Sequence, residues 1–279
     1  MQSFHKKTAV ITGAGSGIGQ QLALQLAAAG AHVALADINK ARLDETAETI
    51  RQRGGTATAH MVDVSKREQV EAFAEEVLRQ HGQADILINN AGVTLGLLSI
   101  EEVSYEEMEW LIGINLWGVI YGTKTFLPHL KTRPEASLVN ISSVFAFSGI
   151  PLQGPYVVSK FGIRGFTETL RGELLDQKNI HVMVVHPGGT KTNIARDARH
   201  RNMDKPSIEQ FNARFDKNAR TTAEDAARLI IRGIRQRKPR LVIGSDAKWM
   251  DRLSRFFPSK AVETFAKMTK RFDQGGDFF

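Results

Sequence analysis

Short, almost wholly apolar runs alternate with longer amphipathic stretches along this chain, and this alternation limits its possible folds. The apolar runs lie at 7–12, 32–36, 56–60, 85–88, 136–141, 180–186 and 240–243. Helical patterns lie between them, at 17–29, 40–52, 66–80, 105–131, 156–177 and 222–236. Strands that are apolar throughout are covered on both faces, and strand–helix alternation is typical of a parallel sheet. The sequence therefore predicts an α/β protein with a doubly wound parallel sheet of about seven strands and helices on both faces.

Three helix starts are marked by capping-box patterns, at Ser65-x-x-Glu68, Ser104-x-x-Glu107 and Thr221-x-x-Glu224. No repeat, low-complexity tract or linker divides the chain, so residues 1–245 are expected to form one domain. Within it, the polar segment 189–220 has few periodic signals and is expected to act as a lid beside a ligand crevice. We call it the lid segment. Residues 246–279 are expected to form an amphipathic helical extension.

Composition excludes several kinds of site. The 279 residues include no cysteine, which rules out disulfides, thiolate metal sites and thiol catalysis. Apolar residues make up 42% and charged residues 24%, the usual mix for a soluble globular protein. Residues 1–7 run straight into the first apolar strand and leave no room for a signal peptide, and no apolar run approaches the ~18 residues of a membrane span. A cytoplasmic protein is expected.

The formal net charge of +7 is concentrated near the C-terminus, in the span from Arg232 to Arg271. Such a basic end could attract an anionic partner, but solvated helix faces are the favoured interpretation, and no nucleic-acid partner is expected. The extension also carries two apolar stripes, one of Trp249, Met250, Leu253, Phe256 and Phe257, the other of Val262, Phe265, Met268 and Phe272. Packing of these stripes on the domain or on a second subunit is favoured over contact with an anionic membrane.

A glycine-rich turn, Thr12-Gly13-Ala14-Gly15-Ser16-Gly17-Ile18-Gly19, joins the first strand to the first helix. A side chain there would block both the tight turn and the approach of a pyrophosphate to the helix N-terminus. The position of this turn between a strand and a helix therefore predicts a dinucleotide site that includes Gly13, Ser16, Gly17, Ile18 and Gly19.

Acidic and small residues end the next strands. Asp37 ends the second strand, where a carboxylate can accept hydrogen bonds from the adenosine-ribose hydroxyls and repel a 2′-phosphate. We therefore expect NAD rather than NADP. Asp63 and Val64 follow the third strand and could meet the adenine. Asn90, Ala91 and Gly92 follow the fourth, where small residues allow close approach of a cofactor.

Tyr156 and Lys160 are four positions apart in a predicted helix, so they share one face. An ammonium beside a phenol favours the phenolate and is expected to lower the tyrosine's pKa, which suits a group that exchanges protons near neutral pH. Ser142 and Ser143 end the fifth strand, and either hydroxyl could face the tyrosine.

Together these motifs resemble the short-chain dehydrogenases/reductases over roughly residues 5–245. The matching positions are Thr12-Gly13-x-x-x-Gly17-x-Gly19, Asn89-Asn90-Ala91-Gly92, Asn115, Ser143, Tyr156-x-x-x-Lys160 and Pro187-Gly188, in the family's order and spacing. The resemblance implies a Rossmann-type fold, a nicotinamide cofactor and an Asn-Ser-Tyr-Lys catalytic tetrad. The thirteen-residue spacing to Tyr156 selects Ser143 over Ser142.

The resemblance also implies a role for each position. Tyr156 exchanges the proton, Ser143 hydrogen-bonds the substrate oxygen, Lys160 holds the nicotinamide ribose and lowers the pKa of Tyr156, and Asn115 holds a water in a proton relay. The nicotinamide carboxamide would be anchored by four further positions, Pro187, Gly188, Thr190 and Thr192. No metal is required. Dimers or tetramers built on helices 105–131 and 156–177 are implied.

The loop between Ser143 and Tyr156 must border the substrate pocket. Its Phe145 and neighbouring aliphatic residues predict a mainly apolar substrate, with Gln153 as one polar contact. Arg196, Arg199, His200 and Arg201 in the lid segment would suit an anionic group, although exposed lid charges are the commoner explanation.

The function expected from the sequence is NAD(H)-dependent interconversion of a hydrophobic secondary alcohol and its ketone. The alternatives are an NADPH-preferring carbonyl or 3-oxoacyl-type reductase and a non-catalytic dinucleotide-binding sensor.

Overall fold

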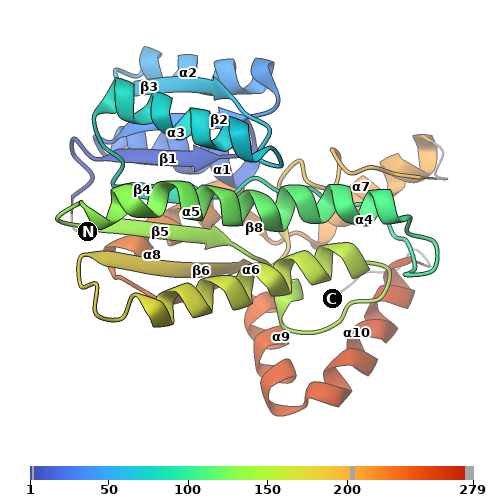
Figure 1. Cartoon of the computed structure of the whole chain (residues 1–279). Coiled ribbons are helices and arrows are strands. Elements are labelled where there is room, and N and C mark those ends of the chain that lie inside the picture. The colour runs from blue at the N-terminus through green and yellow to red at the C-terminus, as the bar shows by residue number, and fades with distance from the viewer. Residues whose placement is uncertain (2, 202–204, 274–279) are drawn as a thin grey trace.

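A seven-stranded parallel sheet forms the centre of the molecule (Figure 1). The computed structural model describes residues 1, 3–201 and 205–273. The strands are β1 (Thr8–Thr12), β2 (His32–Asp37), β3 (Thr56–Met61), β4 (Ile86–Asn89), β5 (Ala136–Ile141), β6 (Ile180–Pro187) and β9 (Arg240–Ile243), in the order β3-β2-β1-β4-β5-β6-β9. Every residue of β1, β4, β5 and β6 is buried. The predicted α/β fold is confirmed, because strands buried on both faces require helices above and below them.

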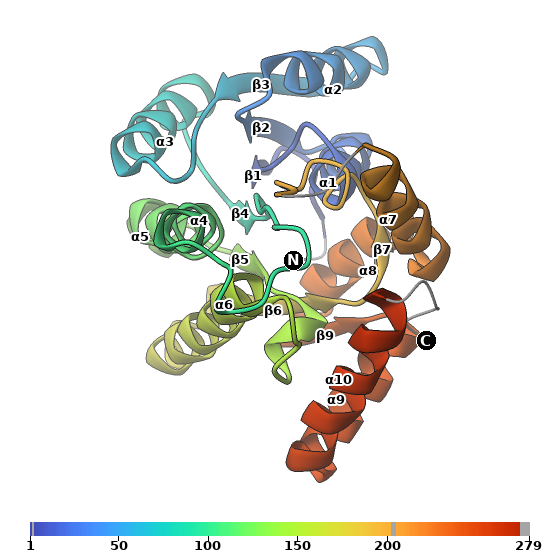
Figure 2. The ribbon, with the colours of Figure 1, turned by 90° about the vertical axis from the view of Figure 1, so that its right-hand side faces the viewer.

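Helices cover the two faces of this sheet (Figure 2). One face packs against α1 (Gly17–Ala28), α2 (Lys40–Gln52) and α8 (Ala223–Arg235), and the other against α3 (Arg67–His81), α5 (Gly118–Lys131) and α6 (Gly154–Glu173). Each face has its own apolar core, centred on residues such as Leu22 and Ile11 on one side and Phe126 and Leu138 on the other.

The three predicted capping boxes have different outcomes. Ser104 caps α4 (Tyr105–Ile112) and forms the complete box with Glu107. The prediction at Ser65 is wrong, because its hydroxyl donates to Asp63 Oδ1 and α3 begins at Arg67 without a side-chain cap. The prediction at Thr221 is also wrong, because Thr222 caps α8 by accepting from the Asp225 N–H and Glu224 takes no part in the cap.

The long helix predicted at 105–131 is interrupted by a π-helical turn, η1 (Gly113–Trp117), between α4 and α5. A π turn inserts an extra residue into the helical ladder, and such turns are frequent at functional sites. This turn carries Asn115.

The lid segment is more regular than its sequence suggested. It holds the short strand β7 (Thr190–Lys191), which pairs with β8 (Thr221–Thr222), and the helix α7 (Lys205–Asn218). Ion pairs hold the lid segment in place. Arg196 pairs with Asp216 within the segment, and Asp197 pairs with Arg42 of α2. One buried ring, Phe211, anchors α7. One buried residue makes no repeating apolar pattern, so the sequence did not predict this helix.

The C-terminal extension forms a hairpin of two helices, α9 (Ser245–Phe256) and α10 (Pro258–Asp273). Met250, Ala261 and Phe265 are fully buried and pack with Val144 and Phe147 of the loop after β5, part of which is the 3-10 turn η2 (Val144–Ala146). Three residues of the two predicted stripes are therefore buried, Met250, Phe265 and Phe272, whereas Trp249, Phe256, Phe257 and Val262 remain exposed. No helix in the part of the chain that the structure describes has both the length and the apolar character needed to cross a bilayer.

Candidate active site

A cavity of roughly 590 Å³ lies at the carboxyl ends of the strands, beside the boundary between the neighbouring strands β1 and β4, where the strand order of the sheet reverses. Crevices at such a switch point are where doubly wound sheets bind ligands. Nearly all the residues predicted for the site line this cavity, namely Gly13, Ser16, Gly17, Ile18, Asp37, Asp63, Val64, Asn90, Ala91, Gly92, Ser143, Phe145, Gln153, Tyr156, Lys160, Pro187, Gly188, Thr190 and Thr192.

Two predicted residues, Gly19 and Asn115, do not line the cavity. Gly19 is buried behind the glycine turn, where an added Cβ would stand 2.1 Å from the Gly13 carbonyl oxygen. Its role is therefore to let the helix pack against the turn, not to contact a ligand directly.

The glycine turn is fixed by the end of β4. Gly13 has a φ of 65°, and a Cβ at this position would lie 2.8 Å from the Ala91 Cα. The Asn90 side-chain amide donates to the carbonyls of Thr12 (3.0 Å) and Gly13 (3.1 Å), while the Thr12 hydroxyl accepts from the Ala91 N–H. Backbone this close leaves room only for glycine and shapes a cradle that fits a pyrophosphate.

Asp37 faces the same turn from the end of β2. Its carboxylate accepts from the Gly15 N–H at 2.8 Å and from the Asn39 N–H at 2.9 Å. Arg42 of α2 lies close enough to interact electrostatically with Asp37, but its guanidinium is hydrogen-bonded by Asp197, which raises the pKa of Arg42. The ribose end of the cavity therefore combines a carboxylate with a cation that is already paired.

Ser143, Tyr156 and Lys160 converge on the cavity from β5 and α6. The side chain of Ser143 is hydrogen-bonded to Tyr156, and the Lys160 Nζ lies 5.4 Å from the centre of the Tyr156 ring. Lys160 is buried and donates to the Ile141 carbonyl at 3.2 Å. The i, i+4 spacing in the helix thus places phenol and ammonium on one face, as the sequence predicted.

The acidity of the pair differs from the sequence-based expectation. Burial raises the pKa of Tyr156 to about 12, and the hydrogen bond with Ser143 offsets only part of that rise. Burial also lowers the pKa of Lys160 to about 8. The expected lowering of the tyrosine pKa was wrong in direction because desolvation of a phenolate outweighs the effect of its neighbours here. Tyr156 is therefore a protonated phenol at neutral pH.

The two serines at the end of β5 have different partners. The Ser142 hydroxyl donates to the Lys160 carbonyl at 2.8 Å and fastens β5 to α6. Ser143 is the serine hydrogen-bonded to Tyr156. His186 lies fully buried beneath this loop, with its Nδ1 3.0 Å from the Ser143 carbonyl and a pKa lowered to about 3 by burial. A histidine held neutral by burial supports the loop and is unsuited to act as a base.

Asn115 is fully buried in the π turn. Its Oδ1 accepts from the Val93 N–H at 2.8 Å, and its Nδ2 donates to the Val93 carbonyl and to the Ser159 hydroxyl. A Cβ on Gly92 would lie 3.4 Å from both Asn115 Oδ1 and Lys160 Nζ. The side chain of Asn115 thus ties the segment after β4 to α6, one residue away from Lys160.

The segment after β6 forms another wall of the cavity. Thr192 lies over the glycine turn, because a Cβ on Gly17 would be 3.1 Å from its side chain. The Thr190 hydroxyl donates to the Gly188 carbonyl at 3.0 Å. Asp246, at the start of α9, was not predicted, yet it accepts from the Gly189 N–H at 2.7 Å and lines the cavity. No local sequence pattern indicates this contact, because Gly189 lies 57 positions before Asp246.

Several large apolar side chains line the cavity beside Tyr156. The Phe145 ring packs edge-on against Tyr156 with 6.0 Å between ring centres. Hydrophobic side chains that the sequence did not suggest come from α7 and from the C-terminal hairpin, namely Phe211, Phe215, Met250 and Phe272. These walls combine distant parts of the chain, so no local pattern could have identified them.

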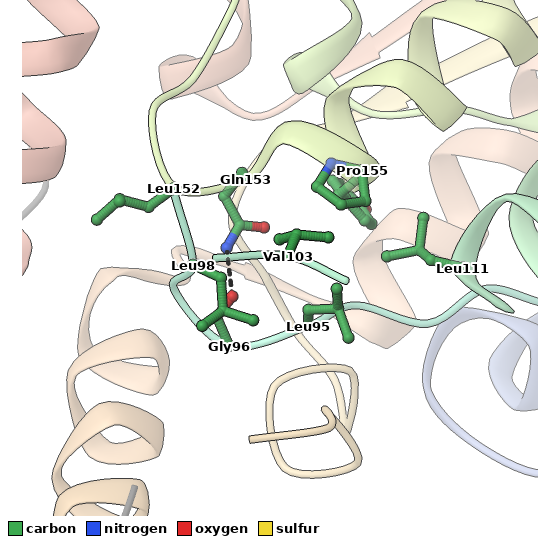
Figure 3. Close-up of a pocket in the computed structure, with 9 residues that line it drawn as sticks. Leu95, Gly96, Leu98, Val103, Leu111, Leu152, Gln153 and Pro155 are labelled. Atoms are coloured by element: carbon green, nitrogen blue, oxygen red, sulfur yellow. Dashed lines mark hydrogen bonds between the residues drawn. The ribbon is translucent and has the colours of Figure 1, made fainter. Parts of the chain in front are cut away.

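Gln153 is held in place by the loop after β4. Its amide nitrogen lies 3.4 Å from the Gly96 carbonyl, drawn as the dashed line in Figure 3, and its Oε1 accepts from Thr94. In this view Leu95, Leu98 and Val103 enclose a small apolar pocket next to it. Gln153 thus closes one end of the cavity beside Tyr156.

The four cationic residues predicted in the lid segment are engaged elsewhere. Arg196 pairs with Asp216, Arg199 lies over the Trp110 ring at 3.6 Å, and Arg201 pairs with Glu107. The His200 Nε2 lies 3.2 Å from the Ala195 carbonyl. None of the four lines the cavity, so their positions do not support binding of an anionic substrate group. Within the described residues, no three His, Asp or Glu side chains cluster as a metal site would require.

Comparison with known proteins identifies the family. The short chain dehydrogenase family profile matches residues 7–203. The chain is a short-chain dehydrogenase/reductase. The oxidoreductase SadH of Mycobacterium tuberculosis is 38% identical to it over 274 residues, which cover 98% of each chain. Members of this family are oxidoreductases that act on CH–OH groups with a nicotinamide dinucleotide, and the chain is therefore an enzyme of that type.

Solved structures agree with this assignment. A short-chain dehydrogenase/reductase from Burkholderia phymatum, in complex with NAD, superposes with a TM-score of 0.86 at 29% identity, covering 94% of this chain and 97% of that one. The 3-ketoacyl-(acyl-carrier-protein) reductase from Brucella melitensis, complexed with NADH, has a TM-score of 0.74 at 28% identity and covers 86% of this chain and 97% of the other.

Proposed function

We propose that this short-chain dehydrogenase/reductase interconverts a hydrophobic secondary alcohol and its ketone with NAD(H). The observation that carries the proposal is the convergence of Ser143, Tyr156 and Lys160 on a cavity that Phe145, Phe215, Met250 and Phe272 also line. The cofactor would supply or accept the hydride. The chain's own residues would orient the substrate and move one proton.

In the direction of reduction, the Tyr156 hydroxyl donates its proton to the carbonyl oxygen, while the Ser143 hydroxyl hydrogen-bonds that oxygen as charge develops on it. A pKa of about 12 keeps Tyr156 protonated at neutral pH, so the donor is ready. In oxidation, Tyr156 first releases its proton to solvent, and the phenolate, stabilised by the Lys160 ammonium, then takes the proton from the alcohol. Asn115 would hold a water that links Lys160 to solvent.

The preference for NAD rests on Asp37. Its carboxylate lies at the end of β2, where the ribose hydroxyls would bind, and a 2′-phosphate there would be repelled. The solved neighbours with NAD and NADH are consistent with that preference. The alternative is an NADPH-preferring reductase. Arg42 could bind the 2′-phosphate of NADPH only if its ion pair with Asp197 were broken. Initial rates with NADH and NADPH decide between them, and a preference for NADPH would refute the Asp37 argument.

The substrate proposal rests on the apolar lining formed by Phe145, Phe215, Met250 and Phe272. A panel of secondary alcohols and ketones, followed by nicotinamide absorbance, tests it. Substrates with a ring or a long alkyl chain should have the highest kcat/KM, because they bury the most apolar surface. Highest kcat/KM for small polar substrates would contradict the proposal.

A non-catalytic dinucleotide sensor is the alternative from another class. Replacing Tyr156 by Phe removes the proton donor and keeps the ring that packs against Phe145. We expect kcat to fall by about 10²- to 10⁴-fold, the usual contribution of general acid–base catalysis, with NADH binding unchanged in a fluorescence titration. Unchanged turnover would refute the mechanism.

Assembly into a dimer or tetramer is proposed through η1 and α6. Trp117, Val158 and Phe161 are large hydrophobic residues that remain 40–49% exposed there. Light scattering of the purified protein gives its mass, and a monomer would contradict this proposal.

A further inference from the structure

The α9–α10 hairpin extends away from the sheet (Figures 1 and 2). All six residues of the turn, 255–260, are exposed. Phe256 is 73% exposed and Phe257 is 55% exposed. We call residues 255–260 the hairpin tip. Two adjacent exposed rings at the end of a projecting element are unusual on a soluble protein and mark an interaction surface.

The rings of Phe256 and Phe257 take no part in the apolar core that packs the hairpin against the domain. Met250, Ala261 and Phe265 are fully buried and supply the contacts that fix the hairpin to the domain. The rings at the tip therefore belong to no core cluster among the described residues. Folding does not require them to be aromatic.

Cations surround the rings. Arg252 precedes Phe256 by four positions and so lies on the same face of α9. The Lys260 Nζ lies 5.8 Å from the centre of the Phe257 ring. The segment 252–260 contains no acidic residue. The tip is thus both apolar and positively charged.

We propose that the hairpin tip binds an anionic lipid surface. Phe256 and Phe257 would enter the boundary between headgroups and acyl chains, and Arg252 and Lys260 would contact the anionic headgroups. Charge disfavours the alternative of a second copy on the same surface, because a two-fold contact through the tip would bring like charges together. The proposal is independent of the reaction assigned above.

Co-sedimentation of the full chain with phosphatidylcholine vesicles, with and without about 30% phosphatidylglycerol, tests this proposal. We expect the protein to pellet with the anionic vesicles and to be released by about 0.5 M salt, which screens the headgroup contacts. Phe256→Ser/Phe257→Ser should weaken binding at least about tenfold by removing the inserted apolar area, and Arg252→Glu/Lys260→Glu should do so by reversing the charge.

Matched controls lie at the other end of the domain. Leu175 is 62% exposed, so Leu175→Ser removes a comparable exposed hydrophobic residue. Arg171→Glu/Lys178→Glu makes the same change in net charge at two exposed positions. Both controls should bind vesicles like the original chain, and all variants should keep their thermal unfolding temperature and their activity on a soluble substrate.

Three results would overturn the proposal. The first is failure of the original chain to pellet with anionic vesicles. The second is equal loss of binding in the tip variants and the controls. The third is dissociation of an oligomer by Phe256→Ser/Phe257→Ser in light scattering, which would make the tip a subunit contact.

Discussion

Asp197 of the lid segment binds the guanidinium of Arg42 through both carboxylate oxygens, at 2.5 and 3.0 Å, across 155 positions of sequence. The pair is 38% and 44% exposed, so its contribution to the free energy of unfolding is expected to be small, at about 1 kcal/mol or less. Its position matters more than its strength. It joins the lid segment to the helix after Asp37 and holds the cation nearest to the ribose end of the cavity.

Asp197→Ala should therefore relax the preference for NADH. A released Arg42 guanidinium could meet a 2′-phosphate, and one such exposed contact corresponds to a change of about three- to tenfold in the ratio of kcat/KM for NADPH and NADH. Steady-state kinetics with both cofactors measure it. Asp216→Ala is the control, because it breaks the Arg196 pair within the lid segment and leaves Arg42 bound. An unchanged ratio in Asp197→Ala would contradict this explanation.

Asp246→Ala should weaken cofactor binding more than it slows the chemical step. The carboxylate accepts from the Gly189 N–H, and its removal leaves that turn without its partner. Loss of a hydrogen bond to a charged group predicts an increase of about 10- to 100-fold in the KM for NADH, with a smaller change in kcat. Asp246→Asn keeps an acceptor and should restore most of the affinity.

Asp251→Ala provides the control for this effect on the same helix. Asp251 pairs with Arg240 and Arg255 outside the cavity. An equal rise in KM in this variant would assign the effect to the stability of α9 instead of the turn.

Gly122→Ala should destabilise the protein. A Cβ at Gly122 would lie 2.3 Å from Asn89 Oδ1, and the Asn89 amide donates to Asn140 and Thr123 in the buried core. Overpacking against this network should lower the free energy of unfolding by about 1–3 kcal/mol in urea titrations. Gly165→Ala in α6 has no atom within 4 Å of the added Cβ and should instead raise it by about 0.5–1 kcal/mol. Similar effects of the two substitutions would argue against close packing of α5 on β4.

Stability should fall between pH 6.5 and pH 5. Burial lowers the pKa of His181 to about 4 and that of His186 to about 3, so both stay neutral in the folded chain while the unfolded chain takes up protons below pH 6.5. The unfolded state binds more protons in this window, and the free energy of unfolding at pH 5 should be lower by about 2 kcal/mol for each histidine.

Urea titrations at pH 7.5 and 5 measure this dependence. His181→Gln should remove about 2 kcal/mol of it, whereas His5→Gln, at an exposed position, should leave it unchanged. The same pH dependence in His181→Gln as in the original chain would show that other groups are responsible.

Local sequence patterns are enough to predict the sheet and the spacing of the candidate site residues. Apolar runs predicted all seven strands of the sheet to within about one residue, because burial on both faces leaves an unbroken local pattern. The relation of Tyr156 to Lys160 followed from helical periodicity alone. Both properties depend on residues close together in the chain.

Only the tertiary structure decided the environment of those residues. Asp197 reaches Arg42, Asp246 reaches Gly189, and α7 and the C-terminal hairpin complete the apolar walls, all through contacts between distant segments. The pKa of Tyr156 is the clearest case. Its neighbour Lys160 was evident from the sequence, but the direction of the shift depends on burial, which the whole fold determines.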